Sequence, residues 1–171
     1  CREVESNPEL HSDLIERWYQ DFDMEFVCEG IDTMTTEIDA LGLVKSKLPE
    51  NVPADITFRK FDQLNDDEML LEWEKAMKAF NPETDGRLPL RLKLYELLME
   101  KTASKGYPVI AAPSSTFAQT VQAMGYKRAV KCMRNKPQVF HEAMEIQLEA
   151  NIKWGMAIAS RGVHGFICID A

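Results

Sequence analysis

The chain has 171 residues, 45% of them hydrophobic, and a formal net charge of -8 at pH 7. This length suits one packed domain, so we expect a single domain over residues 1–171. No segment concentrates Lys and Arg among aromatic residues, which argues against nucleic acid as a partner. There is neither an apolar run of the roughly 18–20 residues that span a bilayer nor a signal-peptide core, so we expect a cytoplasmic protein without membrane contact.

The cysteines and histidines are scattered along the chain. The four cysteines, Cys1, Cys28, Cys132 and Cys168, form no Cys-x-x-Cys pair. The three histidines are equally far apart. This spacing is typical of reduced thiols in a cytoplasmic protein and predicts no metal site within this chain.

The first third of the chain predicts a helix, a strand and an antiparallel excursion. Residues 6–20 begin with capping residues and Pro8, which favour a helix start. An apolar run at 24–28 predicts a short strand, and a Thr-rich segment that ends at Gly42 predicts a loop and a short helix. Residues 43–61 alternate apolar and polar side chains around two prolines, which predicts antiparallel strands facing solvent.

The rest of the chain alternates predicted helices with apolar strands. Helices are expected at 66–80, 90–106, 115–125, from there to Asn135, and at 137–162, with a linker at 81–89. A fully buried strand is expected at 107–113, and a second apolar, buried-looking strand is expected at 165–170. Short, continuous apolar strands between helices are typical of a parallel sheet covered by helices, so the expected class is α/β with right-handed crossovers. A closed eight-stranded barrel needs about 250 residues, so this chain is too short to close one.

In such folds the functional groups gather at the carboxyl ends of the parallel strands. Three strand ends carry candidate residues: Glu29 and Asp32 after the first, Ser114, Ser115 and Thr116 after the second, and Asp170 at the third. The three acids could face one cavity, where a partly desolvated carboxylate serves as acid, base or partner of a cation.

Each of these residues also has a structural interpretation, which the sequence leaves open. Asp32 could cap the following helix, and Asp170 could bond to a neighbouring backbone. Residues 113–119 could be only a Ser/Thr helix cap, since they lack the glycines of a phosphate-binding loop. His164 precedes its strand, on the side away from the expected site, and we interpret it as structural.

Four segments of the chain resemble the uroporphyrinogen decarboxylase superfamily in their local sequence and in their order along the chain. These segments are residues 7–26, 35–43, 88–125 and 134–171. That superfamily includes uroporphyrinogen decarboxylase and cobalamin-dependent methyltransferases. The resemblance implies a (β/α)8 TIM barrel of about twice this length, of which this chain would be a partial barrel, from after the first strand to the fourth. About half of the active site would then lie outside it.

Few functional residues of the family have a counterpart in this sequence. Asp32 is the nearest match to the essential aspartate of the decarboxylase, although the surrounding word differs. Thr120 stands near the position of a tyrosine of the decarboxylase, which this chain lacks. Residues 113–117 stand in place of the family's Gly-Gly-Pro-Phe-Thr turn but have none of its glycines. The words TTEIDALG and ICIDA are closer to the methyltransferases.

The resemblance therefore implies an enzyme, first of all a corrinoid-dependent methyltransferase acting on a small-molecule substrate. Asp32 and Asp170 would be catalytic and line the pocket, with Glu29, Ser114, Ser115 and Thr116 near the substrate. Zinc ligands would lie outside this chain, and a corrinoid protein is a candidate partner.

Two alternatives stay open. One is a tetrapyrrole decarboxylase without a cofactor, in which Asp32 would bind the pyrrole NH groups. The other is a non-catalytic half-barrel that forms a homo-oligomer or pairs with a missing half, because a partial barrel exposes strand edges and apolar faces.

Overall fold

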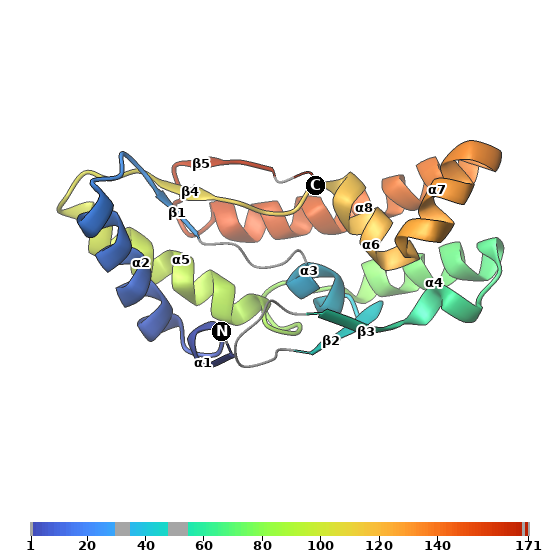
Figure 1. Cartoon of the computed structure of the whole chain (residues 1–171), viewed down its shortest axis with the longest axis horizontal. Helices are drawn as coiled ribbons and strands as arrows, with labels where there is room; N and C mark the ends of the chain where they lie inside the picture. The colour runs from blue at the N-terminus through green and yellow to red at the C-terminus, as the bar shows by residue number, and fades with distance from the viewer. Residues whose placement is uncertain (1, 30–34, 48–54, 169, 171) are drawn as a thin grey trace.

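The computed structural model describes residues 2–29, 35–47, 55–168 and 170 (Figure 1). The helices are α1 (Arg2–Glu5), α2 (Pro8–Phe22), α3 (Thr35–Ala40), the 3-10 helix η1 (Lys60–Gln63), α4 (Asp66–Ala79), α5 (Leu88–Ala103), α6 (Thr116–Met124), α7 (Tyr126–Asn135) and α8 (Pro137–Ala159). The strands are β1 (Val27–Cys28), β2 (Val44–Lys47), β3 (Asp55–Arg59), β4 (Val109–Ala111) and β5 (Gly165–Phe166).

Three short parallel strands form the sheet that positions the site. Their order is β1-β4-β5, with Val27 opposite Val109 and Ile110 opposite Gly165. Helices α2 and α5 pack on each other, and α8 packs against α4, α6 and α7 (Figure 1). Parallel strands joined through helices confirm the predicted α/β class and the expected partial barrel.

Local capping chemistry places the helix starts where the sequence predicts them. The Asn7 side chain accepts a hydrogen bond from the Leu10 amide at 3.0 Å before α2. Asn65 and Glu68 form a capping box at the start of α4. Such caps satisfy amides that have no partner within the helix.

The predicted antiparallel excursion is confirmed. Strands β2 and β3 pair antiparallel, with Val44 opposite Arg59, and a register irregularity lies between Lys45 and Ser46. Gly42, just before this hairpin, has φ +68°, a left-handed conformation that favours glycine after a helix.

One buried core joins the sheet to its helices. Its largest fully buried side chains include Trp73, Tyr95, Phe61, Ile38, Leu43, Leu92, Leu98 and Met124. Apart from Ile38 of α3, they belong to one packed cluster: Leu43 comes from the turn between α3 and β2, and the others come from η1, α4, α5 and α6.

The last predicted strand differs from expectation. Strand β5 covers only Gly165–Phe166, and Phe166 and Ile167 are 45% and 48% exposed. The predicted parallel strand is therefore confirmed, but the expectation that it is buried is wrong. In the described sheet β5 is an edge strand that pairs only with β4, so its outer side lacks a neighbouring strand.

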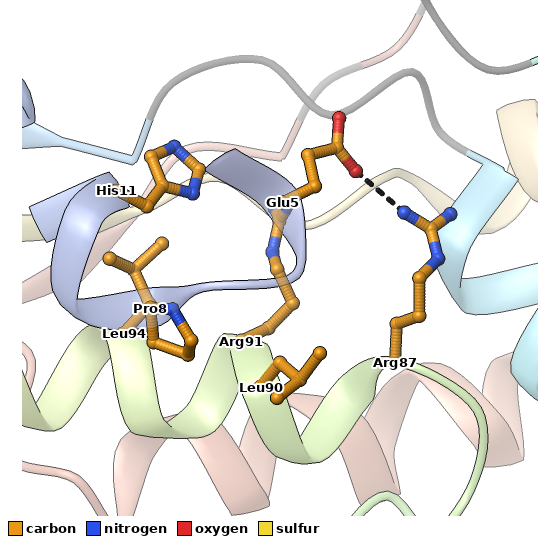
Figure 2. A pocket seen from close by; sticks show the side chains of 7 residues that line it. All are labelled: Glu5, Pro8, His11, Arg87, Leu90, Arg91 and Leu94. Carbon is orange, nitrogen blue, oxygen red and sulfur yellow. Dashed lines mark hydrogen bonds and ion pairs between the residues drawn. The ribbon is translucent and has the colours of Figure 1, made fainter. Parts of the chain in front are cut away.

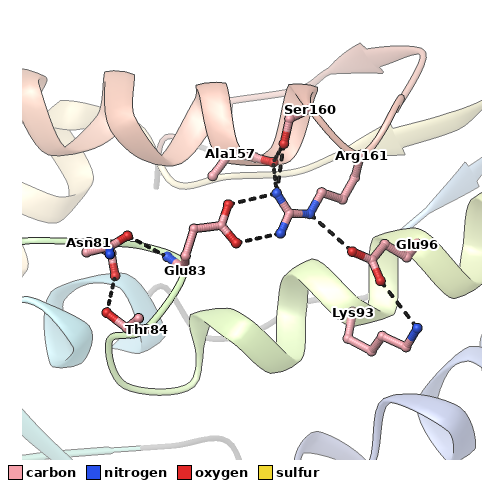
Figure 3. A network of polar contacts seen from close by, with 8 residues as sticks. All are labelled: Asn81, Glu83, Thr84, Lys93, Glu96, Ala157, Ser160 and Arg161. Atoms are coloured by element: carbon pink, nitrogen blue, oxygen red, sulfur yellow. Dashed lines mark hydrogen bonds and ion pairs between the residues drawn. The ribbon is translucent and has the colours of Figure 1, made fainter.

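An arginine just after α8 binds to the loop between α4 and α5 (Figure 3). The Arg161 guanidinium bonds to both carboxylate oxygens of Glu83, at 2.7 and 2.5 Å, and its Nε lies 3.3 Å from a Glu96 oxygen. Arg161 is largely buried, with 18% of its side chain exposed. Such a two-pronged pair fixes orientation as well as charge.

Within the described residues, no helix combines the length and apolar character that crossing a membrane requires.

Candidate functional site

The carboxyl ends of the parallel strands bring together buried polar side chains from five helices. Glu29 follows β1, Ser114 and Ser115 follow β4, and Asp170 lies four residues beyond the end of β5. These described residues thus follow strand ends as expected, whereas the shared cavity for their acids stays a prediction. Asp32 lies outside the described residues.

Glu29 is enclosed rather than open to a pocket. Its side chain is fully buried, forms an ion pair with Arg91, and accepts a hydrogen bond from the Tyr95 hydroxyl. Burial raises the pKa of Tyr95 well above its usual value, and the negative charge of Glu29 raises it further. Tyr95 therefore stays a neutral donor to the carboxylate.

Sequence reasoning missed Arg91 and Tyr95. They stand four residues apart on α5 and so lie on one helix face. Arg87, the residue just before α5, lies one turn earlier and pairs with Glu5 at 2.6 Å beside a cavity of about 10 Å³ (Figure 2). The sequence did contain one signal: Arg87 and Arg91 stand one turn apart at the start of a leucine-rich segment. Such arginines indicate that acidic partners lie elsewhere in the chain.

Helix α2 anchors the end of β1 through a tyrosine. The Tyr19 hydroxyl accepts a hydrogen bond from the Cys28 amide at 2.5 Å and donates one to the Cys28 carbonyl at 3.1 Å. Burial raises the pKa of the Cys28 thiol, and the neighbouring Glu29 charge raises it further. Cys28 is therefore a neutral thiol and unsuited to nucleophilic work.

A second carboxylate, Glu37 of α3, organises the turn after β4. It accepts hydrogen bonds from the Ser114 amide at 3.2 Å, the Gln119 side chain at 3.0 Å and the Trp154 indole at 3.0 Å. These donors come from the β4 turn, α6 and α8. One side chain thus fixes three elements relative to α3. Sequence reasoning missed Glu37 because nothing in the word TTEIDALG marks its partners.

The hydrogen-bond network continues into the interior. The Gln147 amide donates to Gln119 at 2.5 Å and to Asn151 at 3.0 Å, and Gln147 accepts a bond from the Trp73 indole at 3.0 Å. Asn151 donates to the Ser114 carbonyl at 3.1 Å. The Ser114 backbone is therefore held on both sides, by Glu37 and by Asn151. Buried polar groups paired in this way make the turn rigid.

The two carboxylate clusters meet at one small cavity. Its volume is about 10 Å³, and its lining includes Thr36, Glu37, Arg91, Ser114 and Trp154. Arg91, which pairs with Glu29, thus also faces the surroundings of Glu37. This space has room for one water-sized group.

Ser115 and Asp170 form the exposed part of the site. The Ser115 hydroxyl accepts a hydrogen bond from the Ala118 amide at 3.0 Å and donates one to the Asp170 carboxylate at 2.6 Å. The helix-cap interpretation of residues 113–119 is confirmed. Asp170 bonds to a side chain, not to the neighbouring backbone that the sequence left open.

The other residues considered in the sequence have structural positions or roles. Thr116 is the first residue of α6 and is half-buried, and Thr120 is fully buried inside that helix. The His164 ring accepts a hydrogen bond from the Val109 amide at 3.0 Å, in agreement with its structural interpretation. Glu29 and Asp170 have different partners, one in α5 and the other at the α6 cap.

The described side chains do not supply a set of metal ligands. Among the described residues no group of three or more His, Cys, Asp and Glu side chains is arranged to hold a metal ion. The described side chains therefore do not fit a zinc centre.

Comparison with known proteins identifies the family of this sequence. The family model for uroporphyrinogen decarboxylase (URO-D) matches residues 1–171. A solved structure of a methyltransferase from Methanosarcina mazei matches with a TM-score of 0.78 and 18% identity, covering 97% of this chain and 46% of that chain. The present chain thus spans about half the length of this structural neighbour. No curated protein matches the sequence significantly. The chain belongs to the uroporphyrinogen decarboxylase (URO-D) family.

Proposed function

We propose that this chain forms part of the pocket wall of a corrinoid-dependent methyltransferase. The observation that supports this proposal is the likeness in fold, over 97% of the chain, to the methyltransferase from Methanosarcina mazei. The words TTEIDALG and ICIDA, closer to that branch than to the decarboxylases, point the same way.

In this proposal the buried groups keep the pocket wall rigid. The Glu29 carboxylate is neutralised by Arg91 and bonded by Tyr95, so it carries no free charge toward a substrate. Glu37 and Asn151 hold the Ser114 backbone from two sides. Rigid support of this kind holds the groups that contact a substrate in one geometry.

Asp170 is the candidate for direct contact. It is exposed, and among the described residues only one of its oxygens takes a bond, the one from Ser115, so in this proposal the other accepts a hydrogen bond from a substrate. Ser115 would act as a positioning residue for this carboxylate. Asp32, the second predicted catalytic residue, keeps its predicted role of orienting substrate.

The corrinoid would supply the methyl group when bound. The zinc that activates the methyl acceptor would be held by residues outside this chain, and a corrinoid protein remains a proposed partner. The residues described above would orient the substrate and exclude water from it.

The test uses the full-length protein with methylcobalamin and a small thiol, followed by the corrinoid absorption spectrum. Loss of the methyl-corrinoid spectrum is expected for the wild type. Asp170→Asn should reduce the rate by roughly 10²-fold, the effect of removing one positioned group. The matched control is Asp67→Asn, an exposed acid at the start of α4, which should keep the wild-type rate.

Two outcomes would count against methyl transfer. Consumption of uroporphyrinogen with release of carbon dioxide, and no change in the corrinoid, would favour the decarboxylase alternative. No reaction with either substrate would favour a protein that only binds.

A further inference from the structure

A large groove lies away from the strand ends, at the end of the molecule formed by α4 and α7 (Figure 1). Its volume is about 850 Å³, and it runs between η1 with the start of α4 on one side and α7 on the other. We call it the α7 groove. Its apolar floor includes Leu64, Met124 and Cys132. Neither the predicted site residues nor the Glu29 and Glu37 clusters line it.

The α7 groove is positively charged in an acidic protein. Helix α7 reads YKRAVKCMRN, with four cationic residues and no acid. Among the described residues that line the groove, five are cationic and two acidic, so its charge is +3. The chain as a whole carries -8. Such a local reversal of sign steers the approach of negatively charged partners.

The walls of the groove are already held in place. Asp66 pairs with Arg128 at 2.8 Å and with Lys136 at 2.5 Å, and Arg128 also donates to the Phe61 carbonyl at 2.7 Å. Across the α6 side, Arg59 donates to the Gln122 carbonyl at 3.0 Å. Lys136 first, and then Arg128, lower the pKa of Asp66. The groove therefore needs no rearrangement to accept a partner.

Two cations remain for that partner. Lys127 and Lys131 stand four residues apart on the exposed side of α7, and neither forms an ion pair within the described part of the chain. Side chains at this spacing lie on the same helix face. Together they offer two charges to one anionic surface.

The exposure of the rim decides between a small ligand and a protein. Tyr126 lines the groove and is 76% exposed, and Val130, one turn further along α7 and outside the groove lining, is 40% exposed. A small-molecule pocket buries most of its ligand, whereas these side chains stand out into solvent and would be covered only by a broad surface. Tyr is among the residues enriched at protein interfaces.

We propose that the α7 groove docks an acidic protein segment with an apolar anchor, which packs on Tyr126 and the groove floor and pairs with Lys127 and Lys131. This proposal is independent of the reaction proposed above.

The probe is a fluorescein-labelled helical peptide of about 18 residues with Leu on one face and Glu on the other. Its binding to the full-length protein is followed by fluorescence anisotropy. Lys127→Glu with Lys131→Glu should weaken binding by more than about tenfold, and Tyr126→Ala should weaken it by roughly fivefold. The matched control, Arg17→Glu with Lys93→Glu, makes the same charge change on α2 and α5 and should stay within about twofold. Far-UV circular dichroism checks the fold of each variant, and the milder Lys127→Gln with Lys131→Gln replaces any variant that unfolds.

Several results would overturn the proposal. One is the absence of wild-type binding below about 1 mM peptide. Another is equal binding of a peptide with Gln in place of every Glu. A third is equal loss in the control pair. Tighter binding of pyrophosphate or of a DNA duplex, sensitive to the same lysines, would assign the groove to a small anion or to nucleic acid instead.

Discussion

The hydroxyl of Ser115 joins two strand ends by donating a hydrogen bond to the Asp170 carboxylate at 2.6 Å. The same hydroxyl caps α6 by accepting a bond from the Ala118 amide at 3.0 Å. One small side chain therefore starts a helix and positions the exposed acid of the candidate site.

This double role predicts separable effects on stability and activity. Ser115→Ala should lower the free energy of unfolding by about 1 kcal/mol, because an N-cap is lost. Asp170→Ala should change it by no more than about 0.5 kcal/mol, since the residue is exposed, yet should reduce methyl transfer strongly. Urea unfolding and the corrinoid assay measure the two effects, and Ser115→Thr, which keeps a hydroxyl cap, is the control. Full activity of Asp170→Ala would remove this residue from the site.

Glu37 should matter for stability although it is not a core hydrophobic residue. Glu37→Ala leaves the Trp154 indole and the Ser114 amide without their acceptor and removes one of the two acceptors of the Gln119 amide. The expected loss is about 2–4 kcal/mol, because donors left unpaired in the interior are costly. The stability of Glu37→Gln should lie between those of the wild type and Glu37→Ala. Its amide oxygen can still accept a hydrogen bond, whereas its amide nitrogen cannot.

Urea unfolding measures this loss, and near-UV circular dichroism follows the environment of Trp154. Glu145→Ala, at an exposed position of α8, is the matched control and should cost no more than about 0.5 kcal/mol. Equal stability of the two alanine variants would contradict the role given to Glu37.

Tyr95 predicts a loss of stability at alkaline pH. Its pKa in the folded protein is raised well above 10 by burial and by Glu29, whereas in the unfolded chain it titrates near 10. The unfolded chain therefore loses its proton first, and the stabilisation is complete below pH 10 and declines as the pH rises above it.

Urea midpoints between pH 8.5 and 11 measure this decline. Tyr95→Phe, which has no phenolic proton, should be less stable at pH 8.5 by about 1–2 kcal/mol but show a flatter profile above pH 10. A decline as steep in the variant as in the wild type would assign the effect to other groups.

The Arg161 pairs should stabilise the loop between α4 and α5. Arg161→Ala removes the two bonds to Glu83 and the contact with Glu96, and should cost about 1–3 kcal/mol because the guanidinium is largely buried. Arg161→Lys should recover only part of this, since an ammonium cannot form the two-pronged pair. The control is Lys93→Ala, which breaks an exposed pair with Glu96 and should cost less than about 0.5 kcal/mol. Thermal unfolding compares the three variants, and equal losses in all would refute the special role of Arg161.

An apolar stripe on α8 predicts self-association of residues 1–171. Leu148, Ile152 and Met156, spaced by one helix turn, are 48%, 53% and 69% exposed. Exposed apolar stripes of this kind drive association. Sedimentation velocity should reveal dimers or larger species, and replacing the three residues with Gln should shift the distribution toward monomer. A monomeric wild-type chain at all concentrations would contradict this prediction.

The sequence by itself determined the order and type of the elements. The α/β class, the hairpin at 43–61 and the helix starts at Pro8 and Ser115 follow from local rules, because periodicity, proline and capping residues act over a few neighbours. The family resemblance was readable for the same reason, since its words lie within single elements.

Only the tertiary structure decided the partners in the candidate site. Glu29 was predicted to contact a substrate, but the fold pairs it with Arg91 and Tyr95, more than 60 residues away along the chain. Glu37 meets Trp154 from the opposite end of the sequence, and no local pattern signals such a contact. The exposure of β5 was likewise undecided, because burial of a strand depends on which elements stand beside it rather than on its own apolar residues.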